Sequence, residues 1–183
     1  MTAQLTCRRA DMDDATTLAG LYEDVVRRLR DHGIDQWKSG AKDERHFERV
    51  IDSATAEVWL AYDGSGPLGA YELWWSDEQA WGAQPPVAGY VHRLMARPGA
   101  PAGTGRALLR DAEHRIAAAG RELSRLDVMV TSPRLRTYYE EAGYAVVGEL
   151  MDKLAADGTP YGVLLMERPL GHEGQGAQGG QGG

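Results

Sequence analysis

Residues 88–119 contain the feature that most constrains the fold: a strand-like apolar run, a loop rich in glycine and proline, and a helical pattern in direct succession. The run AGYVHRLMA covers 88–96, and the loop RPGAPAGTG covers 97–105. From 103 onward, apolar residues recur at helical spacing until Gly120, on a stripe of Leu109, Ala112, Ile116 and Ala119. Glycines let a backbone approach a ligand closely, and the free N–H groups of a helix N-terminus attract anions. The stretch therefore predicts a strand–loop–helix unit that binds a phosphate group.

Composition narrows the class of protein. A chain of 183 residues suits one domain with a sizeable core, and its net charge of -7 argues against a nucleic-acid-binding surface. Cys7 is the single cysteine, so no internal disulfide forms, and the five histidines lack the spacing of a zinc site. No signal peptide pattern opens the chain, and no run approaches 18 apolar residues. We expect a cytoplasmic protein with no metal, nucleic-acid or membrane partner.

Periodicity and turn residues place the other elements. Helices are expected over 11–33, 44–54 and 132–142, and a hairpin over 57–75 with a Gly-Ser-Gly-Pro turn. Further strands are expected over 124–130, 144–150 and 161–168, the last two separated by Asp157 and Gly158. Residues 1–170 should form one domain, whereas 171–183, rich in glycine and glutamine, should be a disordered tail.

Strict alternation along the strand at 88–96 would divide its side chains between two faces. One face would carry Tyr90, His92, Leu94 and Ala96. The other would carry Val91, Arg93 and Met95. Either face could meet a ligand.

Three segments together resemble the GCN5-related N-acetyltransferase (GNAT) family: the strand YVHRLMA, the Gly103-Thr104-Gly105 turn with its helix, and SPRLRTYYEEAGY at 132–144. The resemblance spans nearly the whole folded body. It implies an α/β (α+β) fold whose mixed, mainly antiparallel sheet of six or seven strands is flanked by about four helices. It also implies acetyl-CoA as cosubstrate and direct transfer of its acetyl group to a primary amine in a ternary complex.

The resemblance also implies where acetyl-CoA binds. Backbone groups of Leu94, Met95 and Ala96 would pair with the pantetheine arm, like an added strand. The pyrophosphate would lie on the helix start formed by Gly103, Thr104, Gly105, Arg106 and Ala107. Ser132 stands where the family often has asparagine. Ala100 stands where the family has Gln or Arg, so one side-chain contact to the phosphates is missing.

Transfer of an acetyl group needs a neutral amine and a proton for the leaving thiolate. His92 is the candidate base because its ordinary pKa suits the task, and Tyr90 and Glu72 are alternatives. The family pattern selects Tyr139 as the donor to the thiolate, with Tyr138 packed in the core.

Aromatic and acidic residues mark a candidate acceptor site. Trp37, Glu72, Trp74 and Tyr90 would contact the amine, and an aromatic wall with Glu72, Asp77 or Glu78 could hold an organic cation. A small-molecule amine is the leading acceptor. A protein or peptide amine, or a catalytically degenerate module that binds acyl-CoA, is the alternative. The resemblance is compatible with a homodimer.

Overall fold

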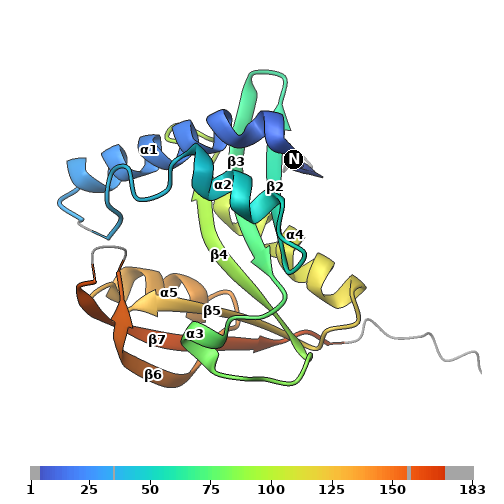
Figure 1. Ribbon diagram of the computed structural model, residues 1–183, viewed down its shortest axis with the longest axis vertical. Coiled ribbons are helices and arrows are strands. Elements are labelled where there is room, and N and C mark those ends of the chain that lie inside the picture. Colours follow the sequence, from blue (N-terminus) through green and yellow to red (C-terminus); the bar gives the residue numbers. More distant parts are fainter. Residues whose placement is uncertain (1–4, 35, 156–157, 172–183) are drawn as a thin grey trace, which may run out of the picture.

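The computed structural model describes residues 5–34, 36–155 and 158–171, in which seven strands form one mixed sheet (Figure 1). The strand order is β1-β2-β3-β4-β5-β7-β6, and every neighbouring pair is antiparallel except β4 and β5. The strands are β1 (Thr6–Arg9), β2 (Ala56–Asp63), β3 (Gly66–Trp74), β4 (Ala88–Ala96), β5 (Leu123–Met129), β6 (Ala145–Leu154) and β7 (Pro160–Pro169). This arrangement confirms the expected mixed, mainly antiparallel sheet.

Five α-helices and a short 3₁₀ turn accompany the sheet in the described ranges, one α-helix more than expected. They are η1 (Met12–Asp14), α1 (Ala15–Asp31), α2 (Glu44–Ile51), α3 (Glu78–Trp81), α4 (Thr104–Ala118) and α5 (Pro133–Glu140). Helix α2 begins where the Asp43 side chain accepts a hydrogen bond from the backbone N–H of His46. Helix α1 ends at His32, and Gly33 follows with φ +70°.

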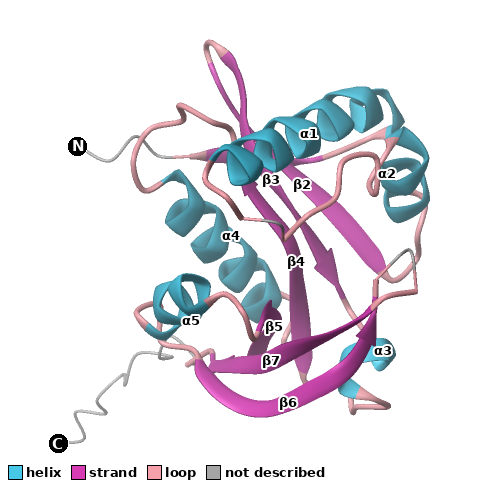
Figure 2. Cartoon of the chain, turned by 90° about the vertical axis from the view of Figure 1, so that its left-hand side faces the viewer, coloured by secondary structure: helices cyan, strands magenta, loops and turns pink. Residues whose placement is uncertain are grey.

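Two apolar clusters lie on opposite faces of the sheet. On one face α1 and α2 bury Leu18, Tyr22 and Phe47 against β2, β3 and β4. On the other face α4 and α5 pack their apolar residues against β3, β4, β5 and β7. Figure 2 shows α1 and α2 separated from α4 and α5 by the strands. The helical stripes expected from the sequence thus form the two cores.

Three elements differ from the expectation. Strand β1 and the single turn of α3 were not expected, because β1 is mostly exposed and carries no apolar alternation, and α3 has only four residues. Strand β6 extends to Leu154, four residues beyond the expected end. The expected turn residue Asp157 and the tail from 172 onward lie outside the described residues. No helix in the described ranges is long and apolar enough to cross a bilayer.

A buried carboxylate joins β3 to β4. Glu72 is fully buried in β3, and both of its oxygens accept hydrogen bonds from the guanidinium of Arg93 in β4. His46 Nε2 donates to the same carboxylate over 2.8 Å, as does Trp74 Nε1. Burial alone would raise the pKa of Glu72, but Arg93 and His46 outweigh it and hold that pKa far below its usual range. Glu72 is therefore an ionised, fully partnered carboxylate inside the protein.

Removing this charge should destabilise the fold. Glu72→Gln leaves Arg93 buried without a counter-charge, and we expect the free energy of unfolding to fall by about 3–5 kcal/mol in urea denaturation. Glu57→Gln is the matched control, since Glu57 also accepts from the tryptophan two residues later but lies partly exposed on β2. Glu57→Gln should lower the free energy of unfolding by less than about 1 kcal/mol. Equal losses in the two variants would contradict a special role for Glu72.

Candidate functional site

Strands β4 and β5 separate partway along their length. They pair only through Ala88–Leu123, Gly89–Ser124 and Tyr90–Arg125. Beyond these pairs β4 continues beside β3, and β5 continues beside β7, so a gap opens between them (Figure 2). The edge of β4 that faces the gap has backbone groups without a strand partner. Such an edge can pair with an extended ligand.

A β-bulge in β4 directs its side chains at this point. The register between β3 and β4 shifts between Ala70 and Glu72, and Arg93 has a φ of +48°. As a result Arg93 points to the same face as His92, where it meets Glu72. The expectation of strict alternation is therefore wrong beyond His92. Met95 joins the core under α1 and α2, whereas Leu94 packs toward the α4 face.

The loop before α4 exposes backbone donors. Gly103 caps the helix with φ +87°, a left-handed conformation that glycine adopts at little cost. The hydroxyl of Thr104 donates to the carbonyl of Pro101 over 2.7 Å and closes the loop. Among the described residues, no acceptor takes the N–H groups of Gly103, Gly105 or Arg106. Together with the helix dipole, these donors make the start of α4 suited to an anion.

The side chain of Ala100 packs inward, whereas that of Arg106 lies beside Tyr138 near the start of α4. The Ala100 side chain packs against the apolar cluster under α4, so position 100 does not point into open solvent. Arg106 lies over the ring of Tyr138, with its Cζ 4.3 Å from the centroid, and its Nη2 donates to the Tyr138 carbonyl over 3.0 Å. Its Nη1 is buried and has no hydrogen-bond partner in the described structure.

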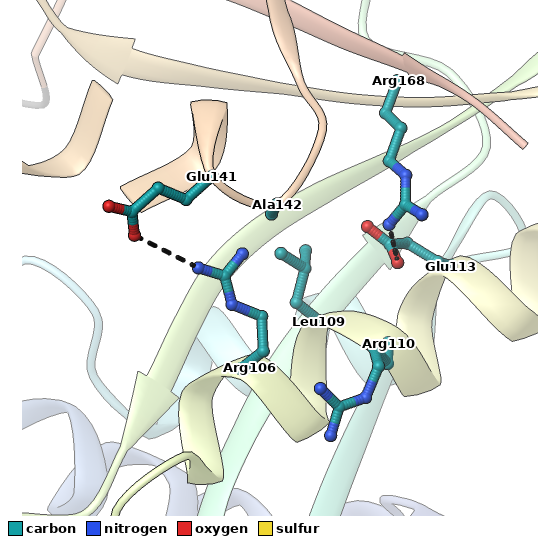
Figure 3. Close-up of a pocket in the computed structure, with 7 residues that line it drawn as sticks. All are labelled: Arg106, Leu109, Arg110, Glu113, Glu141, Ala142 and Arg168. Carbon is teal, nitrogen blue, oxygen red and sulfur yellow. Dashed lines mark hydrogen bonds and ion pairs between the residues drawn. The ribbon is translucent and has the colours of Figure 1, made fainter. Parts of the chain in front are cut away.

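A cavity of about 320 Å³ lies between α4, α5 and β7 (Figure 3). Its lining residues are Arg106, Leu109, Arg110, Glu113, Glu141, Ala142 and Arg168. Three of them are arginines, although Arg168 already binds Glu113 over 2.7 Å. Arg106 pairs with the exposed carboxylate of Glu141 over 4.0 Å, whereas Arg110, one turn further along α4, forms no ion pair within the described ranges.

Helix α5 buries its two tyrosines to different extents. Tyr139 is the more buried residue, at 9% exposure, and its ring packs edge-on against Tyr138 and Tyr144. Tyr138 is half-buried, and its hydroxyl lies over Gly105, where a Cβ would approach it to 3.1 Å. Tyr138 therefore packs against the apolar cluster as expected, but only in part, and its hydroxyl lies outside the core. Burial raises the pKa of Tyr139 well above its ordinary value, so its hydroxyl stays protonated at neutral pH.

Ser132 precedes α5 as its N-cap, but its side chain forms no capping hydrogen bond. The hydroxyl is thus available to another acceptor or donor near the start of this helix.

The remaining candidate residues lie on the face of β3 and β4 that α1 and α2 cover. Tyr90 is buried, and its hydroxyl accepts from Arg125 over 3.2 Å. Glu72 is occupied by the contacts described above. Trp74 and His92 are partly exposed, with their rings edge-on at 5.6 Å. Trp37 stacks on Tyr22 of α1 at 5.2 Å. The structure thus brings Glu72, Trp74, Tyr90 and His92 together, whereas Trp37 lies in the segment between α1 and α2 and stacks against α1.

Three further residues lie beside His92, and of these the sequence indicated only Asp77, as one of three acidic residues that could hold an organic cation. Asp77 follows β3, Asp127 lies on β5, and Lys153 lies on β6. His92 Nε2 is 3.0 Å from Asp77 Oδ2, and Lys153 Nζ donates to Asp127 Oδ2 over 2.8 Å. Only the sheet topology joins them, because residues from four separate segments meet there. Sequence spacing carries no signal for such a cluster.

Comparisons with known proteins identify the fold. No protein-family model matches the chain, and no curated protein matches its sequence. Among solved structures, a GNAT-family protein from Desulfovibrio desulfuricans, assigned as an acetyltransferase, is similar with a TM-score of 0.68 and 16% identity over 91% of this chain and 99% of that one.

Two further similar structures are those of enzymes named for different amine substrates. The spermidine/spermine N-acetyltransferase of Vibrio cholerae is similar with a TM-score of 0.63 and 17% identity, covering 92% of this chain and 94% of its own. An N-acetyltransferase of a ribosomal-protein alanine from Escherichia coli has a TM-score of 0.67 and 13% identity, with coverages of 93% and 97%. The chain therefore has the GNAT fold.

The left-handed cap of α4 can be tested through stability. Gly103→Ala should lower the free energy of unfolding by about 1–2 kcal/mol, because a Cβ is strained at this φ. Gly20→Ala is the control: Gly20 lies inside α1 with open space around it, and alanine there should add about 0.5–1 kcal/mol. Urea denaturation of both variants measures the two shifts. A neutral or stabilising Gly103→Ala would contradict the described loop conformation.

Proposed function

We propose that the chain is an acetyl-CoA-dependent N-acetyltransferase that moves the acetyl group from the thioester to a primary amine, most simply of a small molecule. The observation that carries this proposal is the gap between β4 and β5 leading to a helix start with free N–H groups. An extended acyl arm fits the first feature, and a pyrophosphate fits the second. The GNAT fold of the chain supports the same assignment.

In this proposal the pantetheine arm pairs with the backbone of Leu94, Met95 and Ala96. The pyrophosphate accepts from N–H groups over the segment 103–107, and the Ser132 hydroxyl lies at the other wall. Gly103 adopts φ +87°, which favours glycine, and a Cβ at position 105 would lie 3.1 Å from the Tyr138 hydroxyl, in tight contact. The residues present therefore fit the cosubstrate.

Arg106 takes the place of the side chain that Ala100 lacks. Its guanidinium is held by Tyr138 on one side and lines the cavity between α4 and α5 (Figure 3). Because Tyr138 fixes it in position, little side-chain entropy is lost when it binds a phosphate oxygen.

In the proposed reaction, the base His92 and the thiolate donor Tyr139 lie on opposite faces of the gap. The acceptor enters as RNH₃⁺ and gives one proton to His92; its nitrogen lone pair then attacks the thioester carbonyl carbon. The C–S bond breaks, the thiolate is stabilised by the Tyr139 hydroxyl and leaves as the thiol, and the nitrogen loses its second proton to give the amide. In balance, RNH₃⁺ and the thioester give the amide, the free thiol and one proton.

Which amine accepts the acetyl group, if any does, distinguishes a small-molecule acetyltransferase from a protein or peptide acetyltransferase and from a binding module. The neighbour from Vibrio cholerae acts on spermidine and spermine, and the neighbour from Escherichia coli acts on a protein alanine. A thiol-release screen with acetyl-CoA against small amines and peptides tests both acceptor classes. Acetyl-CoA binding without thiol release on any amine would leave the binding module as the function.

Cosubstrate binding should depend on Arg106 and not on position 100. We expect Arg106→Ala to weaken acetyl-CoA about 10- to 100-fold in calorimetric titration, the effect of losing a charged hydrogen bond. Ala100→Arg should give no tighter binding, because this methyl group packs against the core. A clear gain in affinity from Ala100→Arg, with Arg106→Ala unchanged, would show that the phosphates lie over the loop instead.

Turnover should depend on Tyr139. With any amine found in the screen, we expect Tyr139→Phe to lower kcat about 100-fold while acetyl-CoA affinity changes little, because the hydroxyl interacts with charge that develops during transfer. Tyr138→Phe is the matched control on the same helix and should retain kcat. If the two variants have equal kcat values, Tyr139 is a packing residue only.

A further inference from the structure

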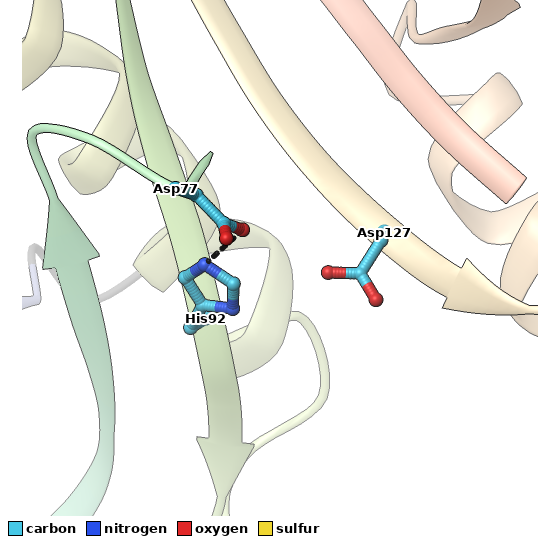
Figure 4. A group of neighbouring side chains, drawn as sticks. All are labelled: Asp77, His92 and Asp127. Carbon is cyan, nitrogen blue, oxygen red and sulfur yellow. Dashed lines mark ion pairs between the residues drawn. The ribbon is translucent and has the colours of Figure 1, made fainter. Parts of the chain in front are cut away.

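Asp77, His92 and Asp127 converge where β4 and β5 begin to separate (Figure 4). Asp77 is the N-cap of α3, with Oδ1 accepting from Ala80 N–H over 3.2 Å. His92 and Asp127 are each two residues beyond Tyr90 and Arg125, the last paired residues of the two strands. All three side chains therefore lie at the narrow end of the gap.

Distances in this cluster match a donor with several N–H groups. One ligand atom from each residue lies within 4.8 Å of the other two. Asp77 Oδ2 and His92 Nε2 are 3.0 Å apart. A nitrogen just out of the plane of three acceptors this close together can therefore lie at hydrogen-bond length from all of them. A primary ammonium carries three N–H donors and satisfies three acceptors at once.

The two carboxylates have partners of different strength: Asp127 pairs with Lys153, whereas Asp77 has only His92 within ion-pair distance among the described residues. Asp127 is neutralised by Lys153, and both side chains are about nine-tenths buried. Asp77 is also 90% buried, and no Lys or Arg of the described ranges forms an ion pair with it. Its Oδ2 is 3.0 Å from His92 Nε2, but it accepts no aligned hydrogen bond. A buried carboxylate oxygen in this state requires a donor.

Asp77 is ionised at neutral pH. Burial would raise its pKa, but the contacts with His92 and the charge of Lys153 outweigh burial and lower that pKa. The cluster therefore carries two carboxylates and one ammonium when His92 is neutral.

We infer that Asp77, His92 and Asp127 bind the primary ammonium of the acceptor. This inference deepens the proposed function, and it rests on that function for identifying the amine as the acceptor. The ammonium adds one positive charge, which balances the second carboxylate. A divalent metal would instead add two positive charges next to the ammonium of Lys153. The indole of Trp74, edge-on to His92, borders the site and suits the alkyl or aryl part of an amine.

The test measures binding of a simple probe, n-butylammonium, by chemical-shift titration of the full chain without acetyl-CoA. We expect saturable shifts at the Trp74 indole N–H and the backbone of residues 77–80. Tetramethylammonium has the same charge but no N–H donor and should cause none of these shifts. Asp77→Asn preserves the cap of α3, since asparagine also caps helices, and should weaken n-butylammonium about tenfold or more. Asp43→Asn, the same change at the N-cap of α2, should bind the probe as the wild type does.

The outcomes separate this inference from the proposed function. Equal affinity in the wild type and Asp77→Asn, no saturable binding by the wild type, or equal shifts from tetramethylammonium would each overturn the ammonium site. Binding of Zn²⁺ that depends on Asp77, with none of n-butylammonium, would overturn it in favour of a metal. Asp77-dependent binding of the probe without thiol release in the amine screen would uphold the site and refute the acetyltransferase.

Discussion

The buried contact between Glu72 and Arg93 is the interaction on which the site depends. A carboxylate without solvent exposure must be partnered, and Arg93 supplies two donors only because β4 bulges there and turns its side chain toward β3. His46 from α2 and Trp74 from β3 complete the set, so the same carboxylate ties two strands and a helix together. A hydrophobic pair could hold the strands, but it would not select this register.

The gap opens on the stretch of β4 that also carries the bulge. Strand β4 stays with β3 through Ala96, whereas β5 stays with β7, and the two strands part after their third pair. Because side chains alternate along each strand, the candidate catalytic residues lie on opposite faces of the sheet. Tyr139 belongs to the core on the α4 face, while His92 and Asp127 point to the opposite face, because they alternate with Val91 and with Leu126 and Val128 of that core. A thioester held in the gap would be reached by a donor from one side and an amine from the other.

The proposed anion site combines backbone N–H groups of a loop with a side chain from the helix that follows it. Prolines flank Ala100, whose methyl group packs inward, so the loop presents backbone N–H groups and no long side chain. Positive charge comes instead from Arg106, one turn into α4, and Tyr138 holds it there through both its ring and its carbonyl. Charge on a rigid helix is better positioned than charge on a loop, because less motion is lost on binding.

The sequence by itself determined the order of the main elements, the helical stripes of α1 and α4, and the glycine turn before α4, because these depend on neighbours three or four residues apart. It also made Tyr139 a candidate through the family motif and His92 a candidate through its ordinary pKa and its place on the strand. It could not reveal the short elements β1 and α3, whose few residues carry no periodic signal. Only the tertiary structure decided that Arg93 turns to the face of His92, that Tyr138 lies over Gly105 while Tyr139 is buried, and that Asp77 and Asp127 meet beside His92. Each of these depends on strand register and on contacts between residues far apart in the chain, and such contacts leave no pattern in a single sequence.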